Sequence, residues 1–143
     1  IAARPSLEEE LEQFVLFESE EDTRDFIEPY SLFQHRECFA SARTQCLSIL
    51  ENGSLVGFCI LLREAKAVEL RRVVVAHSAR GIGQRAIGEV HSYCSEQLGT
   101  GRIWLDVFDF NERGKHIYSK LGYQVIGSNE YDGRKLIIME KVV

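Results

Sequence analysis

The sequence has no long apolar run, little proline and no excess of positive charge. No apolar stretch approaches the roughly 20 residues that a helix needs to cross a bilayer, so we expect no membrane-spanning helix. The opening segment IAARPSLEEEL lacks the pattern of a signal peptide, and none is expected. There are 2 prolines, and neither a repeat nor a Pro/Ser-rich linker divides the chain. The length of 143 residues therefore predicts one domain over residues 1–143.

Cysteines are few and scattered. The 4 cysteines form no C-x-x-C pair, and the 4 histidines share no metal-ligand spacing. We therefore expect neither zinc, nor another metal, nor a disulfide framework, and a reducing, cytoplasmic setting fits best.

Acidic residues outnumber basic ones and give a net charge of −5. This balance argues against a nucleic-acid backbone as the main partner. Many of the acids lie in EEELEQFVLFESEEDTRD. Either this run is the solvated face of a helix, or acids such as Glu20, Glu21 and Asp22 attract a cationic substrate.

The N-terminal third has helical spacing. Ser6 followed by Glu9, and Ser31 followed by Gln34, are capping-box patterns that predict helix starts. Strands are predicted in TQCLSILENGSLVGFCILL, which turns at Asn52-Gly53, in AVELRRVVV, in RIWLDVF and in the last hairpin, which turns at Asp132-Gly133.

Between these strands the apolar period changes from two to about 3.6. Ile82, Ala86, Val90 and Cys94 share one face of a predicted helix, and NERGKHIYSKLG is a second, short helix. Helices and strands in this order predict an α/β fold: a mixed sheet with helices on both faces.

The strand ending at Val75 and the strand from Arg102 to Val107 are joined by a crossover helix, so we expect them to be parallel neighbours. Ligands of open α/β sheets bind beyond the carboxyl ends of such strands. SARGIG follows one of these ends and DVFDFN the other, so the sequence predicts a site there.

The glycines of RGIG lie where a strand passes into a helix. They either provide tight backbone geometry alone, or they let a phosphate approach the N–H groups at the helix N-terminus. A Walker loop would need Lys-Ser/Thr after Gly83, where Gln84-Arg85 stands, and the dinucleotide-binding pattern also fits badly.

Two motifs resemble those of the GCN5-related N-acetyltransferase (GNAT) superfamily, in particular its ribosomal-protein-acetyltransferase-like branch. The first is Ser78-Ala79-Arg80-Gly81-Ile82-Gly83, where the family has Gln or Arg first. The second runs from Asn111 through Gly114 to Tyr118 and is followed by Leu121-Gly122-Tyr123. The resemblance covers essentially the whole chain and implies a mostly antiparallel central sheet with one parallel pair of strands that splay apart.

The resemblance also implies how acetyl-CoA would bind. The pyrophosphate would meet backbone donors of Arg80, Gly81, Ile82, Gly83 and Gln84. The pantetheine arm would pair with the backbone of Val73, Val74 and Val75, and Asn111 would hold it from the other side. An amine would then attack the thioester directly.

By resemblance, Tyr118 would be the general acid that protonates the departing thiolate. The alternative is that its ring only packs against the helix. Glu69 is the candidate base, on a strand face predicted to hold Arg71 and Val73 as well. It would otherwise only pair with Arg71 or Arg72. Asp106, Asp109 and solvent are rival proton acceptors.

The predicted function is N-acetyl transfer to a primary amine of a small molecule or protein. A polyamine, an aminoglycoside, a lysine and a protein N-terminus all remain open as acceptors. The alternative is a catalytically inactive acyl-CoA-binding or sensing module of the same fold. We expect a monomer or homodimer with no nucleic-acid or membrane partner.

Overall fold

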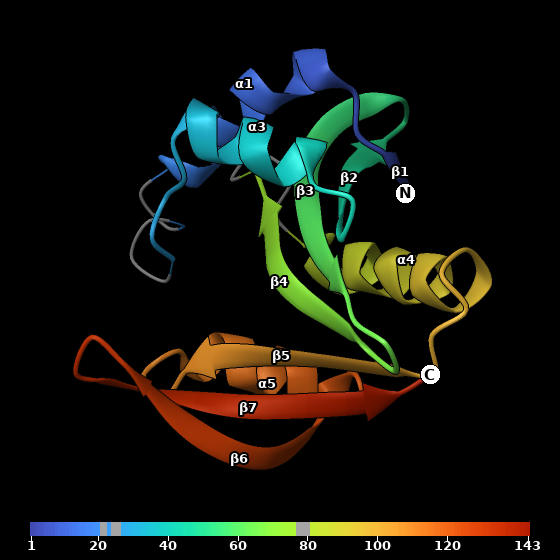
Figure 1. Ribbon diagram of the computed structural model, residues 1–143. Coiled ribbons are helices and arrows are strands. Elements are labelled where there is room, and N and C mark those ends of the chain that lie inside the picture. Colours follow the sequence, from blue (N-terminus) through green and yellow to red (C-terminus); the bar gives the residue numbers. More distant parts are fainter. Residues whose placement is uncertain (21–22, 24–26, 77–80) are drawn as a thin grey trace.

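The computed structural model describes residues 1–20, 23, 27–76 and 81–143. They form a seven-stranded mixed sheet in the order β1-β2-β3-β4-β5-β7-β6 (Figure 1). The described elements are β1 (Ala2–Pro5), the 3-10 helix η1 (Glu8–Glu10), α1 (Leu11–Glu18), α3 (Leu32–Ala40), β2 (Thr44–Glu51), β3 (Ser54–Arg63), β4 (Val68–Val75), α4 (Gly83–Glu96), β5 (Arg102–Phe108), α5 (Glu112–Lys120), β6 (Gln124–Tyr131) and β7 (Arg134–Val142).

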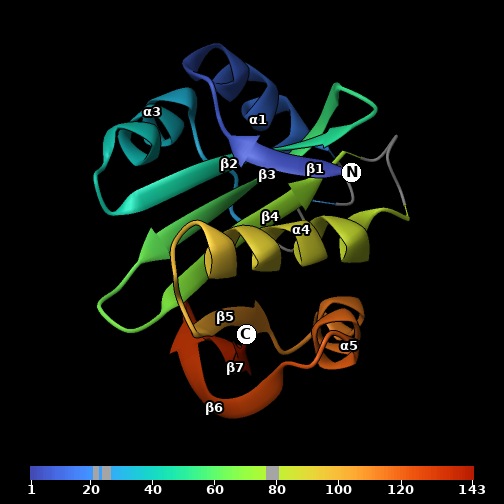
Figure 2. The same cartoon turned by 90° about the vertical axis from the view of Figure 1, so that its right-hand side faces the viewer.

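Helices cover both faces of the sheet (Figure 2). On one face α1 and α3 enclose a core cluster in which Phe14 stacks on Phe58 with 4.3 Å between ring centroids. On the other face α4 and α5 pack on a second cluster that includes Val90 and Leu105. The strand pairs are antiparallel except β4 with β5, which are parallel. The predicted fold class is therefore confirmed.

Both predicted hairpin turns form. Asn52 and Gly53 have φ angles of 51° and 82°, and Asp132 and Gly133 have 51° and 75°. Two successive positive φ angles are what a type I′ turn requires, and Asn-Gly and Asp-Gly adopt them at low cost. The turns fix the pairing of β2 with β3 and of β6 with β7.

The apolar face predicted for the central helix is also confirmed. Ile82, Ala86, Val90 and Cys94 are all buried, because residues at this spacing lie on one side of α4. The capping box at the start of α3 forms as predicted. The Gln34 N–H donates to Ser31 Oγ at 3.2 Å, and the Ser31 N–H donates to Gln34 Oε1 at 2.8 Å.

The beginning of the chain differs from the prediction. Residues Ala2–Pro5 form the edge strand β1 rather than a lead into a helix. Ser6 does not cap a helix. Its hydroxyl accepts a 3.0 Å hydrogen bond from Ser48 of β2. Glu10, not Glu9, receives the Leu7 N–H at 2.8 Å, so the helical turn starts one residue later than Ser6 predicts. Pairing with β2 decides this start, and local spacing could not reveal it.

Candidate active site

Strands β4 and β5 lie side by side where they begin and then separate. Their parallel pairing covers Val68 with Ile103 and Glu69 with Trp104. Beyond this point β4 stays paired with β3 as far as Val75, and β5 stays paired with β7 (Figure 1). Because each strand follows its outer neighbour, a V-shaped gap opens toward the carboxyl ends. The predicted splay is confirmed.

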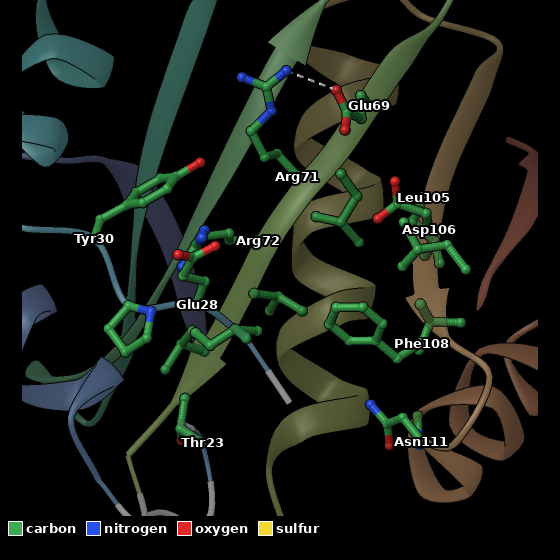
Figure 3. Close-up of a pocket in the computed structure, with 18 of the residues that line it drawn as sticks. Thr23, Glu28, Tyr30, Glu69, Arg71, Arg72, Leu105, Asp106, Phe108 and Asn111 are labelled. Carbon is green, nitrogen blue, oxygen red and sulfur yellow. Dashed lines mark hydrogen bonds and ion pairs between the residues drawn. The ribbon is translucent and has the colours of Figure 1, made fainter. Parts of the chain in front are cut away.

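A cavity of about 780 Å³ occupies the gap. Its walls come from β4, from β5, from the segment before α3 and from α5 (Figure 3). Several residues predicted from the sequence line it together: Glu69, Val73, Val74, Val75, Asn111 and Tyr118. The topology thus brings the candidate residues of β4 and α5 to one hollow.

A β-bulge in β4 changes which side chains share a face. Ile60 pairs with Arg72 and Leu61 with Leu70, so Arg71 is the extra residue. Val73 packs against the same core cluster as Val68 and Leu70, the neighbours of Glu69. Glu69 and Val73 therefore point to opposite faces, and the prediction that they share one is wrong. Strict period-two alternation fails because the bulge inserts one residue.

Two carboxyl groups lie near one guanidinium at the apex of the gap (Figure 3). Arg71 Nη2 donates to Glu69 Oε1 at 3.0 Å. Burial raises the pKa of Glu69 above its usual 4.5, while Arg71 opposes this shift and Asp106 adds to it. Burial likewise raises the pKa of Asp106, again against the influence of Arg71. Each carboxyl group therefore accepts a proton closer to neutral pH than it would in water.

Tyr118 combines a position in the cavity with a position against the core. Its ring meets Tyr123 edge-on, with 5.5 Å between centroids. Burial raises the pKa of its hydroxyl above the usual 10.0, and the nearby Cys59 thiol contributes in the same direction. The hydroxyl is thus protonated at neutral pH. Core packing and a place in the cavity are thus both present at Tyr118.

Asn111 begins α5. Its Oδ1 accepts the Gly114 N–H at 2.9 Å, which is an N-cap interaction. A Cβ at residue 114 would lie 2.7 Å from Asn111 Nδ2, so glycine leaves the room that this amide occupies. The spacing between Asn111 and Gly114 therefore has a structural reason, and the cap directs the amide group at the rim of the cavity.

The β4 backbone is open toward the gap. The Ala76 N–H donates to Val56 O of β3 at 2.7 Å. Because successive residues of a strand direct their backbone groups to alternate sides, the amides and carbonyls of Val73 and Val75 point away from β3. They face the gap, where β5 has already diverged.

The glycine turn leads directly into α4. Gly81 has a φ of +91°, a conformation that side-chain-bearing residues rarely adopt, and no side chain of the described residues caps the helix at Ile82. A Cβ added at Gly81 or Gly83 would meet nothing within 4 Å. Among the described residues, the space beside these two glycines is therefore open. Arg80, predicted with Gly81 to Gln84 as a pyrophosphate donor, lies outside the described residues, as does Ser78.

Asp109, a rival base, is engaged elsewhere. Its Oδ1 accepts a 3.0 Å hydrogen bond from Lys115 Nζ, and this contact lowers the pKa of the carboxyl group. A carboxylate held in this way is a weaker proton acceptor. Of the carboxyl rivals, Asp106 is therefore better suited to the role than Asp109.

Several cavity residues gave no signal in the sequence. The Tyr131 hydroxyl, near the tip of the β6–β7 hairpin, donates to Glu28 Oε2 at 3.1 Å, and both residues line the cavity with Tyr30. These partners are 103 residues apart in the chain, so no local pattern could connect them. Of the acids predicted to attract a cation, Glu21 and Asp22 lie outside the described residues, and Glu28 lines the cavity instead of Glu20.

In the described part of the chain, no three His, Cys, Asp or Glu side chains are grouped so that they could hold a metal ion. Within the same residues, the helices are too short or too polar to cross a membrane.

Comparison with known proteins agrees with this geometry. The model of the Acetyltransferase (GNAT) family matches residues 7–123. The chain belongs to this family. The GNAT match includes β4, the glycine turn, α4, β5 and the Asn111–Tyr118 motif. Of these, β4, β5 and the motif contribute residues that line the cavity.

Curated GNAT relatives share less of their length. The chain is 26% identical over 98 residues to an uncharacterised N-acetyltransferase of Mycobacterium bovis, and equally to one of Mycobacterium tuberculosis. These alignments cover 66% of this chain and 62% of each relative. The chain therefore spans less than two thirds of the length of these relatives.

Solved GNAT structures reproduce the fold. A spermidine N-acetyltransferase of Vibrio cholerae in complex with CoA and spermine has a TM-score of 0.83 at 16% identity, covering 99% of this chain and 94% of that one. An aminoglycoside acetyltransferase in complex with coenzyme A also gives 0.83, at 13% identity, with the same coverage of 99% and 94%. At such low identity the likeness concerns the fold alone.

Proposed function

We propose that this chain is an acetyl-CoA-dependent N-acetyltransferase that acetylates a primary amine, and that residues 1–143 form one acetyl-CoA-binding domain. The observation that carries the proposal is the gap between β4 and β5. It presents unpaired strand backbone at Val73 and Val75, and its cavity is lined by Glu69 and Tyr118. This combination offers a place for a thioester beside a proton acceptor and a proton donor.

The residues present fit CoA. A pantetheine arm carries amides that pair with an open strand edge, and Val73 to Val75 provide one. Asn111 lines the cavity beyond the end of β5, where its amide would hold the same arm from the other side. The turn that leads into α4, from Gly81 to Gln84, would bind the pyrophosphate through N–H groups and the helix dipole, together with Arg80.

The reaction requires two proton transfers. The amine nitrogen attacks the thioester carbon, the carbon–sulfur bond breaks, and the amine proton passes to Glu69, directly or through water. Tyr118 donates its hydroxyl proton to the departing thiolate. Burial supports both assignments, because it raises the pKa of Glu69 toward neutral pH and keeps Tyr118 protonated. Asp106 remains the rival base.

The charged side chains that line the cavity favour a cationic amine. Glu28, Glu69 and Asp106 line the cavity, and Arg72, one of its two arginines, is already paired with buried Glu18. The two solved structures named above are a spermidine N-acetyltransferase and an aminoglycoside acetyltransferase, whose acceptors are cationic amines, and this supports a cationic acceptor here. The candidate acceptors are a polyamine, an aminoglycoside, a lysine and a protein N-terminus.

A narrower set of properties accompanies the proposal. We predict membership of the ribosomal-protein-acetyltransferase-like branch, a cytoplasmic location, and a monomer or homodimer without a nucleic-acid or membrane partner. The net charge of −5 supports the prediction about nucleic acid.

The experiment is a panel of amines assayed with acetyl-CoA by release of free thiol, with acetyl-CoA binding measured in parallel by calorimetry. Turnover of one or more amines is the expected result. Binding of acetyl-CoA with no turnover on any amine would support the alternative, a catalytically inactive acyl-CoA-binding or sensing module. Absence of binding would overturn both.

A further inference from the structure

The segment before α3 forms one wall of the cavity, which we call the acceptor wall; its described lining residues are Thr23, Ile27, Glu28, Pro29 and Tyr30. A fully buried carboxyl group lies behind this wall. Glu18, the last residue of α1, has 0% of its side chain exposed. One carboxylate oxygen is hydrogen-bonded to His35 Nε2 of α3, and the other accepts Arg72 Nη1 of β4. Glu18 therefore connects two helices and a strand of the cavity through a single group.

Arg72 places a positive charge beside this carboxyl group. Arg72 is 10% exposed and forms an ion pair with Glu18. His35 Nε2 is hydrogen-bonded to Glu18, and His35 Nδ1 has no hydrogen-bond partner among the described residues. A buried polar atom without a partner destabilises the fold. His35 therefore lowers the stability of the fold through its unpartnered Nδ1, while it and Arg72 together hold the Glu18 carboxyl group.

Arg72 extends this network into the cavity. Its guanidinium carbon lies 3.5 Å from the centroid of the Tyr30 ring, and both residues line the cavity (Figure 3). The Tyr30 ring also meets the His35 ring edge-on, with 5.5 Å between centroids. A tyrosine on the acceptor wall thus rests on two side chains whose positions Glu18 fixes.

The network also brackets the wall in the sequence. Glu18 and His35 stand at either side of the segment that supplies the wall residues Thr23, Ile27, Glu28, Pro29 and Tyr30. Neither Glu18 nor His35 is among the described residues that line the cavity. Their influence on a bound acceptor must therefore pass through the cavity residues that they contact, Arg72 for Glu18 and Tyr30 for His35.

We propose that Glu18 is a positioning residue for the acceptor amine. Glu18 holds the side chains of Arg72 and His35, and these two side chains contact the Tyr30 ring. Tyr30 in turn positions Glu28, two residues before it, on the acceptor wall. The inference rests on the proposed acetyltransferase function for its kinetic readout. The acetyl-CoA side of the gap, formed by Val73 to Val75, Asn111 and the start of α4, has no contact with Glu18 among the described interactions.

The test compares Glu18→Gln with the matched variant Glu10→Gln. Glu10 is also a poorly exposed carboxylate in a hydrogen-bonded ion pair, with Arg4 at 2.9 Å, but it bonds to Ser48 rather than to a cavity residue. Both variants remove one charge and keep the side-chain shape. Each is measured for melting temperature, for acetyl-CoA affinity, for kcat and KM with an amine found active in the panel, and for hydrogen exchange in peptides covering residues 27–31.

For Glu18→Gln we expect the amine KM to rise at least fivefold and exchange at residues 27–31 to accelerate, with acetyl-CoA affinity within twofold of wild type. For Glu10→Gln we expect a lower melting temperature with the amine KM and that exchange unchanged. If Glu18→Gln lowers only the melting temperature, the residue is structural and the proposal is wrong.

Two provisions keep the test decisive. If Glu18→Gln does not fold, His35→Phe is measured in the same way, since it removes the contact to Glu18 while keeping a ring and the Glu18–Arg72 pair. If wild type acetylates no amine, the proposed function fails, but the exchange rates at residues 27–31 still test the positioning role. Unchanged exchange in the variant that folds would overturn it.

Discussion

Gly57 of β3 lies so close to β4 that a Cβ at this position would be 2.4 Å from the carbonyl oxygen of Val74. It would also be 3.1 Å from the Cα of Val75. Both neighbours are backbone atoms, which cannot rotate aside as a side chain can. Glycine at position 57 therefore lets β3 hold the stretch of β4 whose other edge is open to the cavity.

Gly57→Ala is expected to displace the end of β4. The overpacking should cost about 1–3 kcal/mol of stability, and acetyl-CoA should bind several-fold more weakly because the backbone of Val73 and Val75 moves. Thermal unfolding and calorimetry measure the two effects. The control is Gly127→Ala in β6, where an added Cβ meets nothing within 4 Å. Equal affinities in wild type and Gly57→Ala would contradict the expected role of this strand edge.

Gly83→Val is expected to weaken acetyl-CoA binding at least tenfold, which corresponds to about 1.4 kcal/mol. The added side chain would occupy the open space at the first turn of α4, where we place the pyrophosphate. Gly88→Val is the matched control, because Gly88 lies in the same helix and an added Cβ there also meets nothing within 4 Å. The acetyl-CoA affinity of each variant is measured by calorimetry, after circular dichroism has shown that the variant is folded like the wild type. Similar acetyl-CoA affinities for Gly83→Val and Gly88→Val would show that the pyrophosphate does not bind at this turn.

Tyr118→Phe is expected to lower kcat by roughly 10²-fold or more, the usual contribution of a general acid. The KM for acetyl-CoA should change little, because the lost contact forms mainly in the transition state. Tyr123→Phe is the control. It removes a buried hydroxyl that is hydrogen-bonded to His91 at 2.7 Å, outside the residues that line the cavity. If Tyr118→Phe turns over within threefold of wild type with chemistry rate-limiting, Tyr118 only packs.

The pH profile is expected to identify the base. A general base works deprotonated, so kcat/KM should fall as pH decreases through its pKa. Burial raises the pKa of both Glu69 and Asp106, which moves this acidic limb upward, toward neutral pH, from where an exposed carboxylate would place it. Tyr118, with its raised pKa, should add no basic limb below about pH 10.

Glu69→Gln should reduce kcat and abolish the acidic limb, while Asp106→Asn should keep the limb and shift it slightly downward, because Asp106 raises the pKa of Glu69. Rate profiles of the two variants and of wild type, each from about pH 5 to 9, make the comparison. The reverse pattern would transfer the role to Asp106. If the acidic limb survives in both variants, neither carboxyl group is the base, and solvent accepts the amine proton.

Local chemistry in the sequence was enough to predict much of the fold. Asn52-Gly53 and Asp132-Gly133 form their turns because positive φ is a property of the residues themselves. Ile82, Ala86, Val90 and Cys94 face the core because helical spacing alone places them together. The neighbourhood of Asn111 and Tyr118 also followed, since both lie on one short segment beside the carboxyl end of β5.

Long-range pairing decided what the sequence could not. β1 formed because Ala2–Pro5 found the edge of β2, and the bulge at Arg71 reversed the faces predicted for the end of β4. The Arg71–Asp106 and Glu28–Tyr131 neighbourhoods join segments far apart in the chain, as does the buried network of Glu18.

The sequence by itself determined the order of the strands after β1, the hairpin turns and the two motifs of the family, because each depends on residues close together in the chain. The tertiary structure alone decided which carboxyl groups meet across the gap and how far each is buried. Burial and distance set the pKa of Glu69 and the support of Tyr30, and both are properties of packed surfaces rather than of residue order.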